Sequence, residues 1–273
     1  MSFAAMMVHV DVDRDSEQRV QLALSLADRF ETPLIGIAGL ALRPTFSAAG
    51  VVVYAEPTAD DRRQVTARLN DLGKKFCGQG EALKQIEWRA ALDLPTDLVV
   101  REARAADLII VGPRHKHGSF RDLVDPGAIL LRAGRPVLVV PEIAPPLYLR
   151  RAVVAWKDTR ECRRAVYDAL PLLRQAKEVL LVEFGEDEGK PEAKKALADV
   201  ASYLARHQVI VAEQAWRRSR GPAATELLAF VRDENADLIV AGGYGHSRLG
   251  EWIFGGVTHE LLAESPVCCL LSH

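Results

Sequence analysis

The chain has 273 residues, of which 49% are hydrophobic and 26% charged, and its formal net charge is −2. This length exceeds a usual single domain, so we expect two domains of about 130 to 150 residues, each able to bury a core. The near-neutral charge, with no block of like charges, argues against nucleic acid as the main partner.

The N-terminus lacks a basic leader, and no segment has about 18 uninterrupted apolar residues, so we expect neither a signal peptide nor a membrane span, and a cytoplasmic location. The four cysteines, Cys77, Cys162, Cys268 and Cys269, show no CxxC spacing. We expect them to be small buried side chains rather than disulfide partners or metal ligands.

The first half predicts strands that alternate with helices. Its elements, in chain order, are a strand at Met6–Val10, a helix with Val20, Leu24 and Ala27 on one face, a strand at 33–39, a helix with Val65, Leu69, Leu72 and Phe76 on one face, a strand at 85–91, a helix at 95–105, a strand at 106–112, a short helix and a closing strand at 136–140.

The second half repeats this order. The segment Ala106–Gly112 (ADLIIVG) recurs as Ala236–Gly242 (ADLIVAG), 130 positions later, and the same offset places Pro136 on Pro266. The remaining elements are a strand at 152–156, a helix with Ala165 or Val166, Ala169 and Leu173 on one face, strands at 178–183 and 208–215, helices around 193–204 and 223–235, and a closing strand at 266–271.

Each half therefore predicts a doubly wound α/β unit with a five-stranded parallel sheet. Near-continuous apolar strands such as 108–111 are typical of parallel strands covered on both faces. Three prolines within 141–146 prevent helix or ladder continuation, so this segment is the expected linker. We expect the first domain at residues 1–145 and the second at 146–273.

A glycine-rich loop follows the fourth strand of the second half, where an open parallel sheet has its ligand crevice. Its glycines follow the spacing Gly-x2-Gly-x9-Gly from Gly242, which matches neither the P-loop nor the GxGxxG pattern. Glycines bring backbone amides close to a ligand, and a helix N-terminus attracts phosphate. The amides expected there belong to Gly255, Gly256, Val257 and Thr258.

The five-stranded unit, the ADLIV-type strand, this loop and the Pro-Val closing strand resemble the universal stress protein family, over essentially the whole chain as two copies. The resemblance implies that the loop holds the phosphates of ATP, with or without Mg²⁺, through Gly242, Gly245, Gly255, Gly256 and Val257. It also implies adenine and ribose contacts from Ala155, Trp156, Lys157 and Ala241. His246 and Ser247 either contact the phosphates or stabilise the loop.

The chain departs from the family pattern at two positions of the second half. Gly256 stands where the family has Ser or Thr, with Thr258 two positions on, and Lys157 stands where an Asp usually closes the first strand. The backbone N–H donors are retained when Gly256 replaces Ser or Thr. The replacement of Asp by Lys157 affects the expected contact with the ribose.

The first half departs further from the pattern. His115 and Asp125 replace its second and third glycines, and Pro126 lacks an N–H, although Asp11 closes the first strand as in family members that bind nucleotide. We therefore expect its nucleotide site to be degenerate.

Several other residues have two interpretations. His115 and His117 flank Lys116 in an expected exposed loop and are weak candidates for a metal site. Trp252 and Phe254 fit packing better than stacking on a base. No convincing catalytic set lies near the crevice, although Glu251 and Asp158 are close to it in sequence, so we do not expect a dedicated enzyme.

Three functional hypotheses follow. The leading one is a stress-response regulatory protein that binds ATP or a related nucleotide in its C-terminal half, with an unidentified protein partner. By the family's habit, its halves pack as a pseudo-dimer through the closing strands, and further homodimerisation is open. The alternatives are an interaction module that binds no nucleotide and an adenylating enzyme, which lacks a visible acceptor site.

Overall fold

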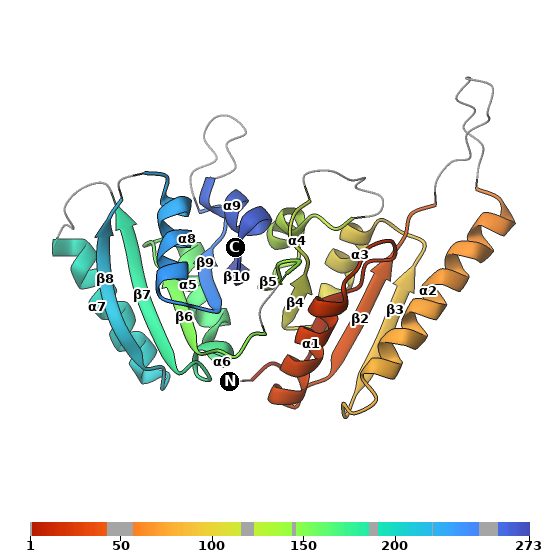
Figure 1. Ribbon diagram of the computed structural model, residues 1–273, viewed down its shortest axis with the longest axis horizontal. Coiled ribbons are helices and arrows are strands. Elements are labelled where there is room, and N and C mark those ends of the chain that lie inside the picture. Colours follow the sequence, from red (N-terminus) through yellow and green to blue (C-terminus); the bar gives the residue numbers. More distant parts are fainter. Residues whose placement is uncertain are drawn as a thin grey trace, which may run out of the picture.

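The computed structural model describes residues 2–42, 57–115, 123–143, 146–185, 191–219, 221–245 and 256–273. The described strands form one continuous ten-stranded sheet in the order β3-β2-β1-β4-β5-β10-β9-β6-β7-β8 (Figure 1). The five strands of each half lie together in this sheet. The expected α/β fold, with two doubly wound halves, is confirmed.

The N-terminal half contains the strands on one side of the sheet and the helices that cover them. Its elements are β1 (Met6–His9), α1 (Glu17–Phe30), β2 (Leu34–Gly39), α2 (Ala59–Gln79), β3 (Ile86–Ala91), α3 (Pro95–Glu102), the 3-10 turn η1 (Ala103–Ala105), β4 (Leu108–Val111), α4 (Pro126–Arg132) and β5 (Val137–Val139).

The C-terminal half repeats these elements, with one additional helix. They are β6 (Arg151–Ala155), α5 (Arg160–Asp168), α6 (Leu170–Leu173), β7 (Glu178–Gly185), α7 (Pro191–Arg206), β8 (Val211–Arg218), α8 (Ala223–Asp233), β9 (Leu238–Gly242), α9 (Gly256–Glu264) and β10 (Cys268–Ser272).

Two boundaries differ from the sequence expectation for local reasons. The helix expected through Ala169 and Leu173 is divided at Ala169, because Pro171 in the first turn of α6 has no N–H to continue the ladder. The strand expected at 208–215 begins only at Val211. Gln208 adopts a left-handed φ of 63° after α7, and the Val209 N–H donates to Leu204 O, so these residues form the turn that ends the helix.

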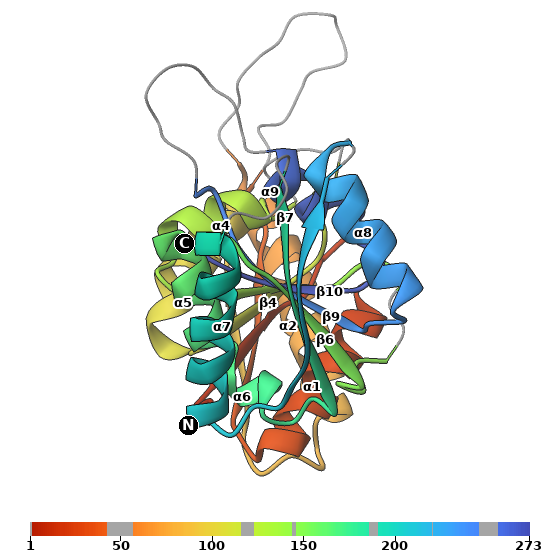
Figure 2. The same cartoon turned by 90° about the vertical axis from the view of Figure 1, so that its left-hand side faces the viewer.

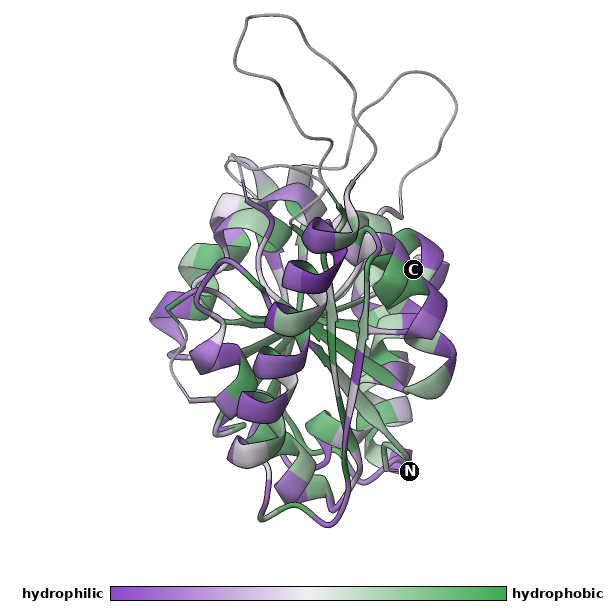
Figure 3. Ribbon diagram, turned by 90° about the vertical axis from the view of Figure 1, so that its right-hand side faces the viewer, coloured by the Kyte–Doolittle hydropathy of each residue, from purple (hydrophilic) through white to green (hydrophobic). Residues whose placement is uncertain are grey.

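Successive strand residues point to opposite faces, so the sheet has a hydrophobic core on each side. Met6 and Val8 of β1 belong to the core on one face, which includes residues of α1, α2, α5, α6 and α7, whereas Met7 belongs to the core on the other face, which includes residues of α3, α4, α8 and α9. Figure 2 shows α7 and α8 on opposite sides of the sheet. In Figure 3 the strands are largely hydrophobic, and the hydrophilic parts of the helices face outward.

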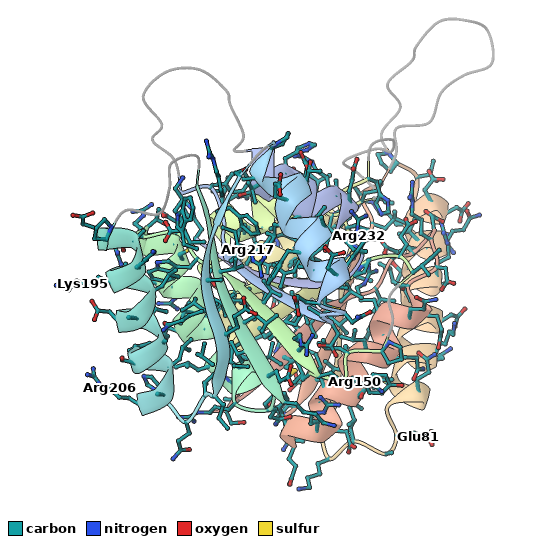
Figure 4. All side chains as sticks on the ribbon, turned by 60° about the vertical axis from the view of Figure 1, so that its left-hand side comes forward. Glu81, Arg150, Lys195, Arg206, Arg217 and Arg232 are labelled. Carbon is teal, nitrogen blue, oxygen red and sulfur yellow. The ribbon has the colours of Figure 1, made fainter. Side chains whose placement is uncertain are left out.

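Charged side chains lie mainly on the outer surface. Figure 4 shows Lys195 and Arg206 of α7, together with Glu81, directed away from the sheet. Arg217 of β8 lies over the Phe230 ring, 4.6 Å from its centroid, so its stem covers apolar surface at the sheet edge. No helix in the described ranges is long and apolar enough to cross a membrane.

Three of the four cysteines are buried and Cys77 is partly buried; all four are free thiols. Burial raises the pKa of Cys268, and it raises the pKa of Cys269 to about 12. A neutral thiol in this setting acts as a small apolar side chain, as expected from the sequence.

The two halves are joined by the antiparallel pairing of β5 with β10, which confirms the expected contact between the closing strands. Leu138 lies opposite Leu270, and Val139 lies opposite Cys269. All other strand pairs of the sheet are parallel. Helices α4 and α9 meet beside this junction (Figure 1).

Truncation of Leu270 at this junction tests its contribution to stability. Leu270 is 0% exposed, so we expect Leu270→Ala to lower the free energy of unfolding by about 2 to 5 kcal/mol. Leu92→Ala, at a leucine that is 36% exposed, is the control and should cost less than about 1 kcal/mol. Urea unfolding of both variants gives the two values, and equal losses would contradict the prediction.

Candidate functional site

The order of the strands reverses beside β6 in the C-terminal half. The chain passes from β6 to β7 on one side, whereas β9 lies on the other side, with Ala155 opposite Ala241. The carboxyl ends of β6 and β9 therefore lie next to each other, at the place where open parallel sheets bind ligands. Most of the expected site residues that the structure describes lie at this edge.

The end of β6 and the following turn are well defined. The Trp156 N–H donates to Val182 O at 2.7 Å, and the Thr159 N–H donates to Lys157 O at 2.7 Å. The Thr159 side chain then caps α5 by accepting from the Cys162 N–H at 3.3 Å. Trp156 is buried, whereas Lys157 is exposed.

The glycine loop packs closely against the first turn of α5. A Cβ added at Gly242 would lie 2.5 Å from the Cys162 nitrogen, and one added at Gly245 would lie 2.9 Å from a carboxylate oxygen of Glu161. Gly242 is thus required by a close approach of two backbones, in addition to any role toward a ligand.

Glu161 places a buried carboxylate beneath this loop. Burial opposes its ionisation, but hydrogen bonds from Arg160, from its own backbone N–H and from Thr159 together hold the pKa of Glu161 below its usual value. The group is therefore negatively charged at neutral pH. The sequence analysis did not identify it; its signal was an acidic residue in the first helical turn after the strand.

Two amides of the loop are already bonded within the protein. The Gly243 N–H donates to Ser272 O at 2.8 Å, and the Tyr244 N–H donates to the Thr258 hydroxyl at 3.2 Å. Thr258 is buried, and its hydroxyl holds the loop against α9. Gly256 begins α9 and is exposed, and Val257 follows it.

Some expected site residues lie outside the described residues, so the structure does not place them. They are His246, Ser247 and Gly255, together with Glu251, Trp252, Phe254 and His117. Asp158 is described; it is exposed and forms an ion pair with Arg163. Among the described residues, no group of three His, Cys, Asp or Glu side chains lies close enough to hold a metal ion.

The equivalent crevice of the N-terminal half is filled by an ion pair. Asp11, at the end of β1, is paired with Arg19, and both side chains are buried. Arg19 also donates to His9 O at 2.9 Å, and a Cβ added at Gly112 would lie 2.1 Å from its guanidinium. The guanidinium therefore lies directly on the backbone at the end of β4.

His115 lies at the rim of the filled crevice. Its side chain is 16% exposed, less than expected for an exposed loop, and its Nδ1 lies 3.0 Å from Arg14 and 3.3 Å from Glu142. Burial and the neighbouring Arg14 lower its pKa, although Glu142 and Asp11 oppose this. Its contacts are thus with charged side chains of the same half.

The carboxyl ends of β6 and β7 carry two polar atoms without a hydrogen-bond partner in the described structure. Trp156 Nε1 and Glu183 Oε2 are both buried and unpaired in this sense. Burial, reinforced by Asp158 and opposed by Lys157, raises the pKa of Glu183. The sequence analysis missed Glu183, although a carboxylic acid at the very end of the expected strand 178–183 was a signal.

The strand register identifies the residues of the N-terminal half that are equivalent to Trp156 and Glu183. Met6 of β1 and Ala152 of β6 both lie beside the first residue of the repeated strand, Leu108 or Leu238, which makes Val10 equivalent to Trp156. The Val10 N–H donates to Ile37 O, and the Trp156 N–H donates to Val182 O, so Ile37 is equivalent to Val182. The residues that follow them, Ala38 and Glu183, are therefore also equivalent. Two apolar residues of the N-terminal half thus have polar, unpaired counterparts in the C-terminal half.

Comparison with known proteins identifies the C-terminal half. The model of the family described as "Universal stress protein family" matches residues 149–273. Residues 149–273 belong to the universal stress protein family. No curated protein matches the chain.

Solved structures match the chain over both halves. A universal stress protein from Archaeoglobus fulgidus DSM 4304 is 14% identical, with a TM-score of 0.73 over 98% of this chain and 95% of that one. A functionally unknown protein from Pseudomonas aeruginosa PAO1 is 15% identical, with a TM-score of 0.64 over 99% of this chain and 92% of that one. The N-terminal half therefore shares the tandem universal stress protein fold.

A shorter structure, of a universal stress protein in complex with cAMP, is 22% identical, with a TM-score of 0.36 over 52% of this chain and 100% of that one.

Removal of Arg19 tests whether the ion pair stabilises the filled crevice. Arg19→Met leaves the buried Asp11 carboxylate without its cation, so we expect a loss of about 3 to 5 kcal/mol in the free energy of unfolding. Arg163→Met breaks an exposed pair with Asp158 and should cost less than about 1 kcal/mol. Chemical denaturation measures both, and a small loss for Arg19→Met would contradict the interpretation.

The buried His9 predicts a pH dependence of stability. Burial lowers its pKa from 6.5 to about 4, with Asp11 opposing and Arg19 reinforcing the shift. The unfolded chain then binds a proton that the folded chain does not, so stability is lost as the pH falls from 6.5 toward 4, by up to roughly 3 kcal/mol. In urea unfolding at several pH values, His9→Phe should show a smaller loss across this window than the parent; identical slopes would refute the assignment.

Proposed function

We propose that the C-terminal half binds an adenine nucleotide, ATP or a related one, at the carboxyl ends of β6 and β9, and that the protein is a stress-response regulator acting in the cytoplasm. Occupancy of the site then alters the binding of a protein partner. The proposal includes no dedicated catalysis; any ATP hydrolysis would be slow and incidental.

The observation that carries this proposal is the contrast between the two halves at equivalent positions. The N-terminal half has Val10 and Ala38 where the C-terminal half has Trp156 and Glu183, whose polar atoms are buried and unpaired in the described structure. Buried polar groups without partners are costly. A ligand with donors and acceptors, such as a purine or a ribose, would supply the missing partners.

The part of the proposed site that would face the phosphates also differs between the halves. At the end of the first strand, the buried, ion-paired Asp11 is replaced by the exposed Lys157. Gly112 is covered by the Arg19 guanidinium, whereas Gly242 meets the backbone of α5. A phosphate at the C-terminal edge would therefore approach an exposed lysine rather than a buried ion pair.

The carboxylate of Glu161 leads us to include Mg²⁺ in the proposed site. Its carboxylate lies beside Gly245, where a triphosphate without a counterion would be repelled. Mg²⁺ prefers carboxylate and phosphate oxygens and neutralises the charge between them. We therefore propose that a magnesium complex of the nucleotide binds more tightly than the free nucleotide.

A second function, an interaction module that binds no nucleotide, is favoured by one observation. The Gly243 and Tyr244 amides are satisfied inside the protein, so neither is available to a phosphate without rearrangement. The proposal therefore depends on backbone donors around the start of α9, where Gly256 is exposed.

Trp156→Phe tests the proposed site. Phenylalanine keeps an aromatic ring but removes the indole N–H, so we expect MgATP binding to weaken about 3- to 10-fold, the value of one hydrogen bond. Trp88→Phe is a matched control, because Trp88 Nε1 in the N-terminal half is also buried without a partner in the described structure, and its affinity should equal that of the parent.

Isothermal titration calorimetry with ATP, in the presence of Mg²⁺ or of a chelator, provides the measurement. Tighter binding with Mg²⁺ is expected for the parent. A parent that binds neither ATP nor cAMP would overturn the nucleotide proposal and favour the interaction module. Equal weakening by Trp156→Phe and Trp88→Phe would place the ligand elsewhere.

A further inference from the structure

Tyr244 connects the glycine loop of the C-terminal half with the N-terminal half. It lies between Gly243 and Gly245 and adopts a left-handed φ of 58°, which is uncommon for a residue with a bulky side chain. Its N–H is held by the Thr258 hydroxyl of α9. The backbone conformation at this point is thus fixed by contacts within the C-terminal half.

The Tyr244 side chain reaches the start of α4 in the other half. A Cβ added at Gly127 would lie 2.4 Å from the Tyr244 hydroxyl oxygen. Burial raises the pKa of Tyr244, as does Asp125, whereas Arg114 lowers it, so the phenol lies in the electrostatic field of both charges. Tyr244 therefore ends in a polar cluster formed by the N-terminal half.

Further contacts fasten the same junction. A Cβ added at Gly243 would lie 2.5 Å from Leu130 of α4, and the Arg114 N–H donates to Leu262 O of α9 at 2.6 Å. Inside the cluster, the Asp125 carboxylate accepts from the Gly127 N–H at 3.0 Å. Gly243 and the residues around it thus lie in close contact with α4, and Arg114 is bonded to α9.

The 130-residue offset shows which positions of the repeat this contact joins. Arg114 and Tyr244 occupy the same position of the repeat, and Asp125 to Gly127 corresponds to Gly255 to Val257. Tyr244 therefore extends from one glycine loop to the start of the helix that follows the other loop.

We propose that Tyr244 is a positioning residue through which ligand binding at the glycine loop and the conformation of α4 in the N-terminal half influence each other. This rests on the proposed nucleotide site. A ligand held by the loop backbone fixes the position of Tyr244 and hence its contact with Gly127. By thermodynamic reciprocity, a change at Gly127 alters ligand affinity in the other half.

Gly127→Ala is the sharpest test of this connection. Gly127 is the second residue of α4, and a Cβ there would also lie 3.3 Å from the Asp125 oxygen that caps the helix, so the rescue variant below is needed to isolate the contact with Tyr244. The methyl group of the alanine would collide with the Tyr244 hydroxyl and displace the loop, so we expect MgATP binding to weaken by at least about fivefold. Gly78→Ala is the matched control, since a Cβ there meets nothing within 4 Å, and it should bind as the parent does.

Tyr244→Phe should rescue the effect. It removes the oxygen that collides with the new methyl group, so the double variant Gly127→Ala/Tyr244→Phe should regain an affinity within about twofold of Tyr244→Phe alone. Hydrogen exchange gives a second readout. MgATP should protect the amides of residues 126–132 in the parent, and this protection should be smaller in Tyr244→Phe.

The outcomes separate this inference from the proposed function. If the parent binds MgATP and Gly127→Ala binds it equally well, the inference fails while the proposed function stands. Weaker binding by Gly127→Ala without rescue by Tyr244→Phe would also overturn it. If the parent binds no nucleotide, the proposed function fails and ligand coupling with it. In that case, the unfolding free energies of the two single variants and the double variant test whether Tyr244 contacts Gly127. If the losses of the single variants add up to the loss of the double variant, the contact is refuted.

Discussion

The antiparallel pairing of β5 with β10 is the constraint on which the rest of the architecture depends. It joins two parallel five-stranded sheets through apolar residues such as Leu138 and Leu270, so both hydrophobic cores continue from one half into the other. It also brings α4 and α9 together. The two crevices are therefore close enough for a side chain of one half to reach the other.

Within this shared frame the two crevices have diverged by a few side chains. In the N-terminal half, a buried ion pair of Asp11 and Arg19 occupies this edge of the sheet. In the C-terminal half, the same edge carries an exposed lysine and two polar atoms that the described residues do not satisfy. In the proposed function a ligand supplies the partners of Trp156 and Glu183, whereas the ion pair of Asp11 and Arg19 occupies the equivalent edge of the other half.

Sequence reasoning identified the features that depend on local pattern. The repeated ADLI segments, the apolar stripes and the closing strands gave the two doubly wound halves, because burial and periodicity act over short stretches. It missed features that depend on distant partners. That Arg19 covers Gly112, that Glu161 lies beside Gly245 and that Gly242 touches α5 follow from how helices dock on the sheet. The resemblance to the family assigned Gly242 and Gly245 to phosphate binding, although helix packing also requires Gly242.

The junction also explains what a fused pair of domains makes possible. In a symmetric dimer of identical chains, the residue at the position of Arg114 and Tyr244 would be the same in both subunits. In this chain a tyrosine extends from the C-terminal loop to the start of α4, while an arginine at the equivalent position lies near Asp125. A charged group and an aromatic phenol therefore meet across a pseudo-twofold axis, where two arginines would repel each other. Fusion permits this pairing, and with it the proposed arrangement in which one half holds a ligand and is coupled reciprocally to the other half.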